Sequence, residues 1–173
     1  MSLLDLMTSR RSVRRFIPNR IIPKSLLDQI VEAGHVAPSA CNKQPWHFFL
    51  IQSEEAKRKI QDCYDRSWVK DASAYILVAG EVNNSWKHPD GYGDTSLYTD
   101  CGIATTHMML EAWSEGIASV WICAFDRAKC CQHLGLNMEG VRPISILALG
   151  YADVDVSTLP FNRKDISEVL TVL

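Results

Sequence analysis

Apolar residues recur along the chain at two spacings, one typical of helices and one of strands. Repeats of three to four residues, which put apolar side chains on one helical face, mark segments 2–9, 23–33, 54–65 and 96–115. Asp126 is placed to cap a shorter helix that reaches residue 134. Continuous apolar runs bounded by turn residues predict strands at 47–51, 74–80, 118–125 and 143–151. Strands separated by helices predict one sheet with helices on its faces, in an α+β or α/β arrangement.

The helical segment 96–115 differs from the others because its centre, residues 101–110, carries almost no charge. A helix with so little polar surface is expected to be buried on all sides, either in a domain core or between two subunits. In a chain this short we favour the subunit interface. His107 stands out as the histidine of that stretch, and we expect a hydrogen-bonded core histidine there and not a catalytic one.

Two loops carry polar groups suited to binding. Residues 37–46 place Pro38 and Pro45 around small and amide residues, which predicts an ordered loop and not a helix. Asn42 and Gln44 each offer a donor and an acceptor, which suits either the edge of a heterocycle or hydrogen bonds to their own loop backbone. The second loop, 83–95, is long and polar, as expected of a lid or a partner contact.

Composition narrows the classes of function. With 47% apolar and 22% charged residues, the 173-residue chain reads as one globular domain, which we place at residues 1–173. A net charge of −2 argues against broad binding to nucleic acid or to an anionic membrane surface. No apolar run approaches the roughly 20 residues that a membrane-spanning helix needs.

Cysteine usage indicates a reducing compartment. The first residues do not form a basic region followed by an apolar core, so we expect no secretion signal and a cytoplasmic protein with reduced thiols. No Cys-x-x-Cys pair occurs, and the adjacent Cys130 and Cys131 have poor spacing for zinc. We therefore predict no metal site.

The densest local charge is the run Arg-Arg-Ser-Val-Arg-Arg-Phe at residues 10–16. The guanidinium fork of arginine fits phosphate, and Ser12 adds a hydroxyl between the two arginine pairs. The run therefore predicts a phosphate site. The alternative is a solvated basic end of the preceding helix, because cations are favourable at helix C-termini.

Five segments, in this order along the chain, resemble the nitroreductase family of FMN-dependent oxidoreductases. They are the arginine run at 10–16, Ala-Pro-Ser-Ala-Cys-Asn-Lys-Gln-Pro-Trp at 37–46, Asp-Cys-Gly-Ile-Ala-Thr-Thr-His-Met-Met-Leu at 100–110, Gly-Ile-Ala-Ser-Val-Trp-Ile at 116–122, and Ala-Leu-Gly-Tyr at 148–151. The resemblance extends from about residue 3 to residue 164. It implies an α+β fold with a central, mostly antiparallel sheet flanked by helices, in an intertwined homodimer whose long core helices meet at the interface.

The resemblance also implies an enzyme with two FMN sites shared between subunits. It would take hydride from NADH or NADPH onto flavin N5 and reduce nitroaromatics, quinones or a similar electron-poor small molecule. Since the flavin carries the chemistry, no side chain is expected to act as a catalytic acid, base or nucleophile. The alternative is a flavin-binding reservoir or sensor with little turnover.

Carried over residue by residue, the resemblance assigns three groups of contacts to FMN. The phosphate, ribityl chain and pyrimidine edge would be held by Arg10, Arg11, Ser12 and Arg14, with Arg163 closing on the phosphate. The flavin would be contacted, from the partner subunit, by Pro38, Ser39, Ala40, Asn42 and Gln44. The stretch near N5 would be Ile122, Cys123 and Ala124. Two positions depart from the family pattern: Phe161 stands where larger members often carry lysine, and Cys123-Ala124 where relatives often have glycine.

Overall fold

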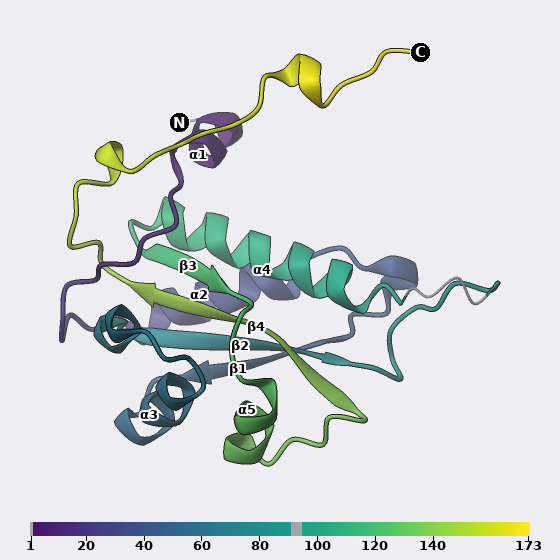
Figure 1. Cartoon of the computed structure of the whole chain (residues 1–173), viewed down its shortest axis with the longest axis horizontal. Coiled ribbons are helices and arrows are strands. Elements are labelled where there is room, and N and C mark those ends of the chain that lie inside the picture. The colour runs from purple at the N-terminus through teal and green to yellow at the C-terminus, as the bar shows by residue number, and fades with distance from the viewer. Residues whose placement is uncertain (1, 91–94) are drawn as a thin grey trace.

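The computed structural model describes residues 2–90 and 95–173 (Figure 1). In this part of the chain a four-stranded sheet is formed by β1 (Trp46–Ile51), β2 (Ala74–Glu81), β3 (Ala118–Ile122) and β4 (Val141–Gly150). The strand order is β1-β2-β4-β3, and each neighbouring pair is antiparallel. The predicted central antiparallel sheet is confirmed.

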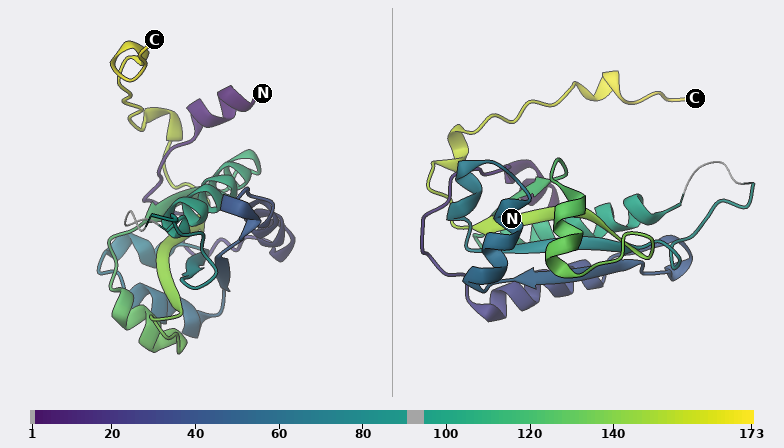
Figure 2. Two further views of the ribbon diagram at one scale, coloured as in Figure 1. Left: turned by 90° about the vertical axis from the view of Figure 1, so that its right-hand side faces the viewer. Right: turned by 60° about the horizontal axis from the view of Figure 1, so that its bottom comes forward.

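Helices cover both faces of this sheet (Figures 1 and 2). On one face lie α2 (Lys24–His35) and α4 (Leu97–Ser114), and on the other α3 (Glu54–Asp62) and α5 (Arg127–Leu134). Strand β2 contributes side chains to the hydrophobic cores on both faces of the sheet. Ile76 and Val78 pack in the core under α2 and α4, while Tyr75 and Leu77 pack in the core on the opposite face. A strand buried on both faces reads as an unbroken apolar run, which is why the sequence shows one at this place.

Side chains cap the starts of two helices, and the cap predicted at Asp126 is confirmed. Ser2 and Asp5 form a reciprocal capping box at α1 (Leu3–Ser9), and the Asp126 carboxylate accepts a hydrogen bond of 2.9 Å from the Lys129 N–H at the start of α5. The charged helix expected at 54–65 ends earlier, at Asp62, so Cys63 lies at its C-terminal cap.

The strand expected at 118–125 is shorter than the prediction. Strand β3 ends at Ile122, which pairs with Ile146, so Cys123 and Ala124 lie beyond the strand. Pairing stops where β4 enters a bulge, marked by the register shift that pairs Ala79 with Pro143. A bulge bends its strand, and proline cannot donate to a ladder, so the neighbouring edge strand loses its partner there.

Helix α4 is buried along one side and open along the other. Its open side, with α1 and Trp121 beside it, lines a shallow cavity of about 420 Å³. Tyr98 and Thr106 are exposed there, and His107 is half-buried at the edge. A single chain therefore does not bury α4 on all sides, so the domain-core alternative is wrong and the favoured subunit interface stays a prediction. His107 lies at the edge of the open side and is not a core histidine of the single chain. No helix in the described residues is long and apolar enough to cross a membrane.

The arginine run follows α1 along the free edge of β3. The Val13 N–H donates to the Ser119 carbonyl at 3.0 Å, and Phe16 forms an isolated bridge with Ala152. Val13 and Phe16 are buried and anchor the extended segment to the sheet. Arg14, between these two anchors, is exposed. The extended segment thus lies against the edge of β3 and is held in place there, with its cationic side chains attached to it.

We expect Gly150→Ala to lower the free energy of unfolding by about 1–3 kcal/mol, the usual cost of overpacking a core. A Cβ atom at Gly150 would lie 2.6 Å from Cδ1 of the buried Phe16 ring, so the ring and the arginine run behind it must shift. Urea unfolding measures the loss. Gly140→Ala is the matched control, because its new Cβ would meet nothing nearer than the Asn137 carbonyl oxygen at 3.9 Å. Equal stability of both variants would contradict the packing described.

Candidate functional site

The two ends of the chain meet in a cationic cavity. The segment after α1 and the C-terminal tail run along the same side of the molecule (Figures 1 and 2), and between them lies a cavity of about 190 Å³. Its lining consists of Arg10, Arg11, Ser12, Arg14, Leu159, Pro160, Phe161 and Arg163. The structure thus brings the four predicted residues of the run together with Arg163, which is distant in sequence. We call this the arginine cavity.

Arg11 and Arg163 are held by the same aromatic ring. The Arg11 guanidinium carbon lies 4.4 Å from the centre of the Phe161 ring and that of Arg163 lies 4.3 Å from it, both within cation–π range. Arg11 also donates from Nε to the Leu159 carbonyl at 3.2 Å and from Nη1 to the Thr8 carbonyl at 2.7 Å. Phe161 therefore positions two cations beside the cavity.

Arg10 is the most deeply placed of these cations. It is half-buried, and its Nη1 atom is fully covered with no hydrogen-bond partner among the described residues. Burial, together with the cations of Arg163 and Arg11, lowers the pKa of the Arg10 guanidinium. A covered donor without a partner, repelled by neighbouring like charges, is unfavourable unless an anion fills the space. The geometry is that of an anion site.

The remaining arginines differ in role. Arg14 lines the cavity at its exposed rim, whereas Arg15 does not line it and pairs with Asp153 at 3.6 Å. Arg11 binds carbonyls of the last turn of α1, which is what the alternative of a basic helix end predicted. Arg11 thus binds the helix end and also lines the cavity, and the phosphate site stays a prediction.

The second predicted group lies elsewhere in the chain. Residues 38–44 connect α2 to β1 near the N-terminal end of α4, and none of them lines the arginine cavity. The Gln44 N–H donates to Ser39 Oγ at 2.9 Å, and Gln44 Nε2 donates to Asn42 Oδ1 at 3.0 Å. Within one chain the loop therefore hydrogen-bonds itself, which was the alternative to binding a heterocycle edge.

The backbone of this loop is strained and is held by a residue that sequence reasoning missed. Cys41, Asn42 and Gln44 have φ angles of 49°, 53° and 47°, in the left-handed region that non-glycine residues rarely adopt. The Ala40 N–H donates to Asp100 Oδ1 at 3.1 Å, although Asp100 is only 2% exposed. Its Oδ2 atom is buried without a partner among the described residues. The one signal in the sequence was an acidic residue in the first turn of a helix whose centre is uncharged.

We expect Asp100→Ala to lower the free energy of unfolding by about 1–3 kcal/mol, because it removes the acceptor of the Ala40 N–H inside a strained loop. Asp100→Asn keeps an acceptor and removes the buried charge, so we expect it to retain most of the stability. Chemical unfolding compares the two variants. A loss as large for Asn as for Ala would show that the carboxylate charge, and not the hydrogen bond, orders the loop.

The third predicted group lies where β3 ends. Ile122 is buried, Cys123 and Ala124 are exposed, and the Cys123 carbonyl accepts a hydrogen bond of 3.2 Å from Arg127 Nη2. These residues do not line the arginine cavity either. Among the described residues no group of three or more His, Cys, Asp or Glu side chains is placed to hold a metal ion.

Comparison with known proteins identifies the relatives of the chain. The model of a family described as the nitroreductase family matches residues 7–67 and 60–151. A protein of Methanothermobacter thermautotrophicus, provisionally named NADH dehydrogenase/NAD(P)H nitroreductase, is 32% identical over 155 residues, covering 87% of this chain and 78% of the relative.

Two solved structures have the same fold. A nitroreductase family protein from Clostridium difficile 630 superposes with a TM-score of 0.87 at 29% identity, covering 99% of this chain and 98% of the other. A protein from Exiguobacterium sibiricum, described provisionally as a nitroreductase and solved in complex with FMN, gives a TM-score of 0.87 at 23% identity, covering 100% and 98%.

Proposed function

The chain belongs to the nitroreductase family, and from this premise we propose that it is an FMN-dependent oxidoreductase using NADH or NADPH. The acceptor we propose is an electron-poor small molecule, such as a nitroaromatic or a quinone. The observation that carries the proposal is the arginine cavity, where Arg10 has a covered donor without a partner.

The residues of the arginine cavity fit the phosphate end of FMN. A phosphate monoester carries up to two negative charges and several acceptor oxygens, and the guanidinium fork of arginine can bind two of those oxygens at once. Arg10 and Arg163 supply guanidinium donors close together, Arg14 adds one at the rim, and Ser12 adds a hydroxyl. Such an anion would remove the repulsion among these cations and give Arg10 Nη1 its missing partner.

The separation of the other predicted contacts supports a site shared between two subunits. Residues 38–44 lie outside the arginine cavity of their own chain, near the opposite end of α4 (Figure 1). In a homodimer the loop of one subunit would approach the cavity of the other, as the family resemblance implies. Asp100 would then hold the partner-facing loop in its strained shape.

The open side of α4 supports the same homodimer. Ile103, Leu110 and Trp121 are half-buried along the shallow cavity there, and Met7 of α1 is 44% exposed beside them. Contiguous apolar surface of this kind on a chain marks a protein interface. We therefore place α4 at the centre of the proposed dimer.

In this proposal the protein binds and orients the cofactor, and the cofactor carries the chemistry. Bound FMN would supply the redox chemistry between the nicotinamide and the acceptor. Arg10, Arg14 and Arg163 would hold the cofactor by its phosphate. The chain after Ile122 would border the flavin, where exposed Cys123 and Ala124 present small side chains. A cytoplasmic location, where thiols remain reduced, is part of the proposal and is compatible with six free cysteines.

Steady-state kinetics with FMN-loaded protein tests the proposed activity. NADH or NADPH consumption is followed at saturating donor with a nitroaromatic, a quinone and no acceptor. We expect acceptor-dependent turnover with at least one combination of nicotinamide donor and acceptor. FMN bound at one per chain without turnover on any pair would reject the reductase and favour the reservoir or sensor. Absence of FMN binding would reject both.

A further inference from the structure

A second cationic cavity lies beside α3 and α5, and the proposed function does not use it. Its volume is about 780 Å³, and none of its lining residues belongs to the arginine cavity. We call it the α3–α5 cavity. Four cations and two carboxylates line it: Arg58, Arg66, Lys70, Lys129, Asp62 and Asp65. The lining therefore has an excess of two positive charges, although the whole chain has a net charge of −2.

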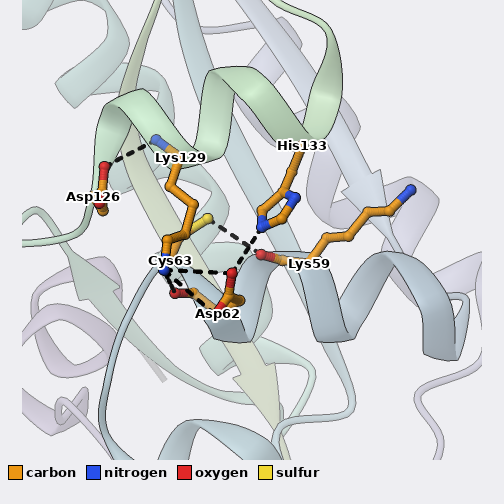
Figure 3. A network of polar contacts seen from close by, with 6 residues as sticks. All are labelled: Lys59, Asp62, Cys63, Asp126, Lys129 and His133. Atoms are coloured by element: carbon orange, nitrogen blue, oxygen red, sulfur yellow. Dashed lines mark hydrogen bonds and ion pairs between the residues drawn. The ribbon is translucent and has the colours of Figure 1, made fainter.

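One carboxylate of the lining is already paired with residues of α5 (Figure 3). Asp62 Oδ2 lies 2.9 Å from His133 Nε2 and 3.4 Å from Lys129 Nζ. Hydrogen bonding to His133, opposed by burial and aided by the cation of Lys129, lowers the pKa of the Asp62 carboxyl. Asp62 and Lys129 therefore compensate each other's charge and connect α3 to α5 at one wall of the cavity.

The other three cations of the lining, Arg58, Arg66 and Lys70, form no ion pair among the described residues. Arg58 donates from Nε to the Glu54 carbonyl at 3.1 Å, which is an uncharged acceptor of its own helix. Asp65, the second carboxylate of the lining, pairs with none of the three. Three cationic groups thus border one cavity with a single carboxylate to balance them.

The same helix shows that pairing is available to its cations elsewhere. Lys57 and Lys59 of α3 do not line the cavity, and they pair with Glu54 and Glu55 at 2.6 and 2.9 Å. Arg58 lies between these two lysines in sequence and has no carboxylate partner. Cations of α3 are therefore compensated away from the cavity and uncompensated beside it.

The donors, the size and one aromatic ring define the class of ligand. Arginine and lysine bind phosphate oxygens, and the Ser67 hydroxyl adds a further donor to the lining. The volume is in the range of small-molecule sites and exceeds what a single phosphate group needs. The half-buried Tyr64 ring, packed edge-on against Trp68 with ring centres 5.7 Å apart, adds an aromatic wall. A phosphate joined to an organic body with an aromatic ring satisfies all three features.

We propose that the α3–α5 cavity is a second anion site, which binds a phosphate monoester of mononucleotide size. Arg58, Arg66 and Lys70 bind the phosphate oxygens, and the Tyr64 ring contacts the organic part of the ligand. The paired Asp62 and Lys129 form the wall on the side of α5. The site is separate from the arginine cavity and does not depend on the proposed function.

Amide chemical shifts locate the binding site directly. The full-length, isotope-labelled protein, as purified, is titrated with adenosine monophosphate, and separately with inorganic phosphate and with adenosine. We expect saturable shifts at residues 64–70 and 129 with adenosine monophosphate, weaker binding of inorganic phosphate, and no saturable shift with adenosine. Because the residues of each cavity are read separately, the result does not depend on whether the chain binds FMN.

Three outcomes would overturn the proposal. Adenosine monophosphate that shifts no amide, or only amides of residues 10–14, would leave the α3–α5 cavity without a ligand. Adenosine binding as tightly as its monophosphate would show that the cations do not contribute. Inorganic phosphate binding as tightly as adenosine monophosphate would show that the organic part makes no contact.

A double variant tests the cations. Arg66→Gln combined with Lys70→Gln should weaken binding of adenosine monophosphate about tenfold or more, since two charge-assisted contacts are lost at an exposed site. Both side chains are exposed, so the fold should be kept, which the amide spectrum checks. Lys59→Gln is the matched control, because Lys59 pairs with Glu55 and does not line the cavity, and its affinity should change little. Equal affinity of the double variant and the wild type would refute the assignment.

Discussion

Replacing Arg10 and Arg14 together by alanine is expected to weaken FMN binding by about 10²- to 10⁴-fold. Charge-assisted hydrogen bonds contribute about 1.5–3 kcal/mol each, so two lost contacts amount to about 3–6 kcal/mol. Arg10 presents a covered donor without a partner, and Arg14 stands at the rim of the same cavity. Quenching of flavin fluorescence on titration of FMN with apoprotein measures the change in Kd.

The control for this pair lies in the same arginine run. Arg15→Ala removes an arginine that pairs with Asp153 and does not line the cavity, so FMN affinity should change little. The double variant should also keep its melting temperature without FMN, because removing Arg10 relieves burial and repulsion from Arg11 and Arg163. Unchanged affinity in the folded double variant would refute the phosphate assignment.

The second large effect concerns assembly. We expect Thr106→Arg to convert a dimer into a monomer, since it places a charged side chain in the middle of the open side of α4. Thr106 is exposed in the single chain, so the substitution should leave the fold of each subunit intact. Sedimentation velocity reads the mass, and circular dichroism checks the fold.

Ser114→Arg is the matched control, because Ser114 is exposed at the end of the same helix and does not line that cavity. This variant should remain a dimer with wild-type FMN affinity. Thr106→Arg should lose FMN together with the dimer, since the proposed site needs the loop of a second subunit. A monomeric variant that binds FMN as tightly as the wild type would show that one chain suffices.

Much of this fold is predictable because local and tertiary signals agree. The runs in β2 and β4 are apolar without alternation because both faces of the sheet are covered. The cap at Asp126 marks the start of α5 from the sequence alone. The end of β3 was not predictable in the same way, since it depends on a bulge in β4, a partner distant in sequence.

The site was predictable in residue type and less so in arrangement. The arginine run predicted an anion site from the sequence, yet only the fold shows that Phe161 stacks on both Arg11 and Arg163. Asp100 escaped notice because its importance lies in a hydrogen bond to Ala40 across the structure.

The most direct test of the central claim is the visible spectrum of the protein purified from cells, recorded without oxygen before and after addition of NADH or NADPH. The account predicts a flavin spectrum that at least one nicotinamide bleaches, with colour returning when an acceptor is added. A flavin spectrum that neither nicotinamide bleaches would contradict the reductase. A colourless protein that also fails to take up added FMN would contradict the assignment of the arginine cavity.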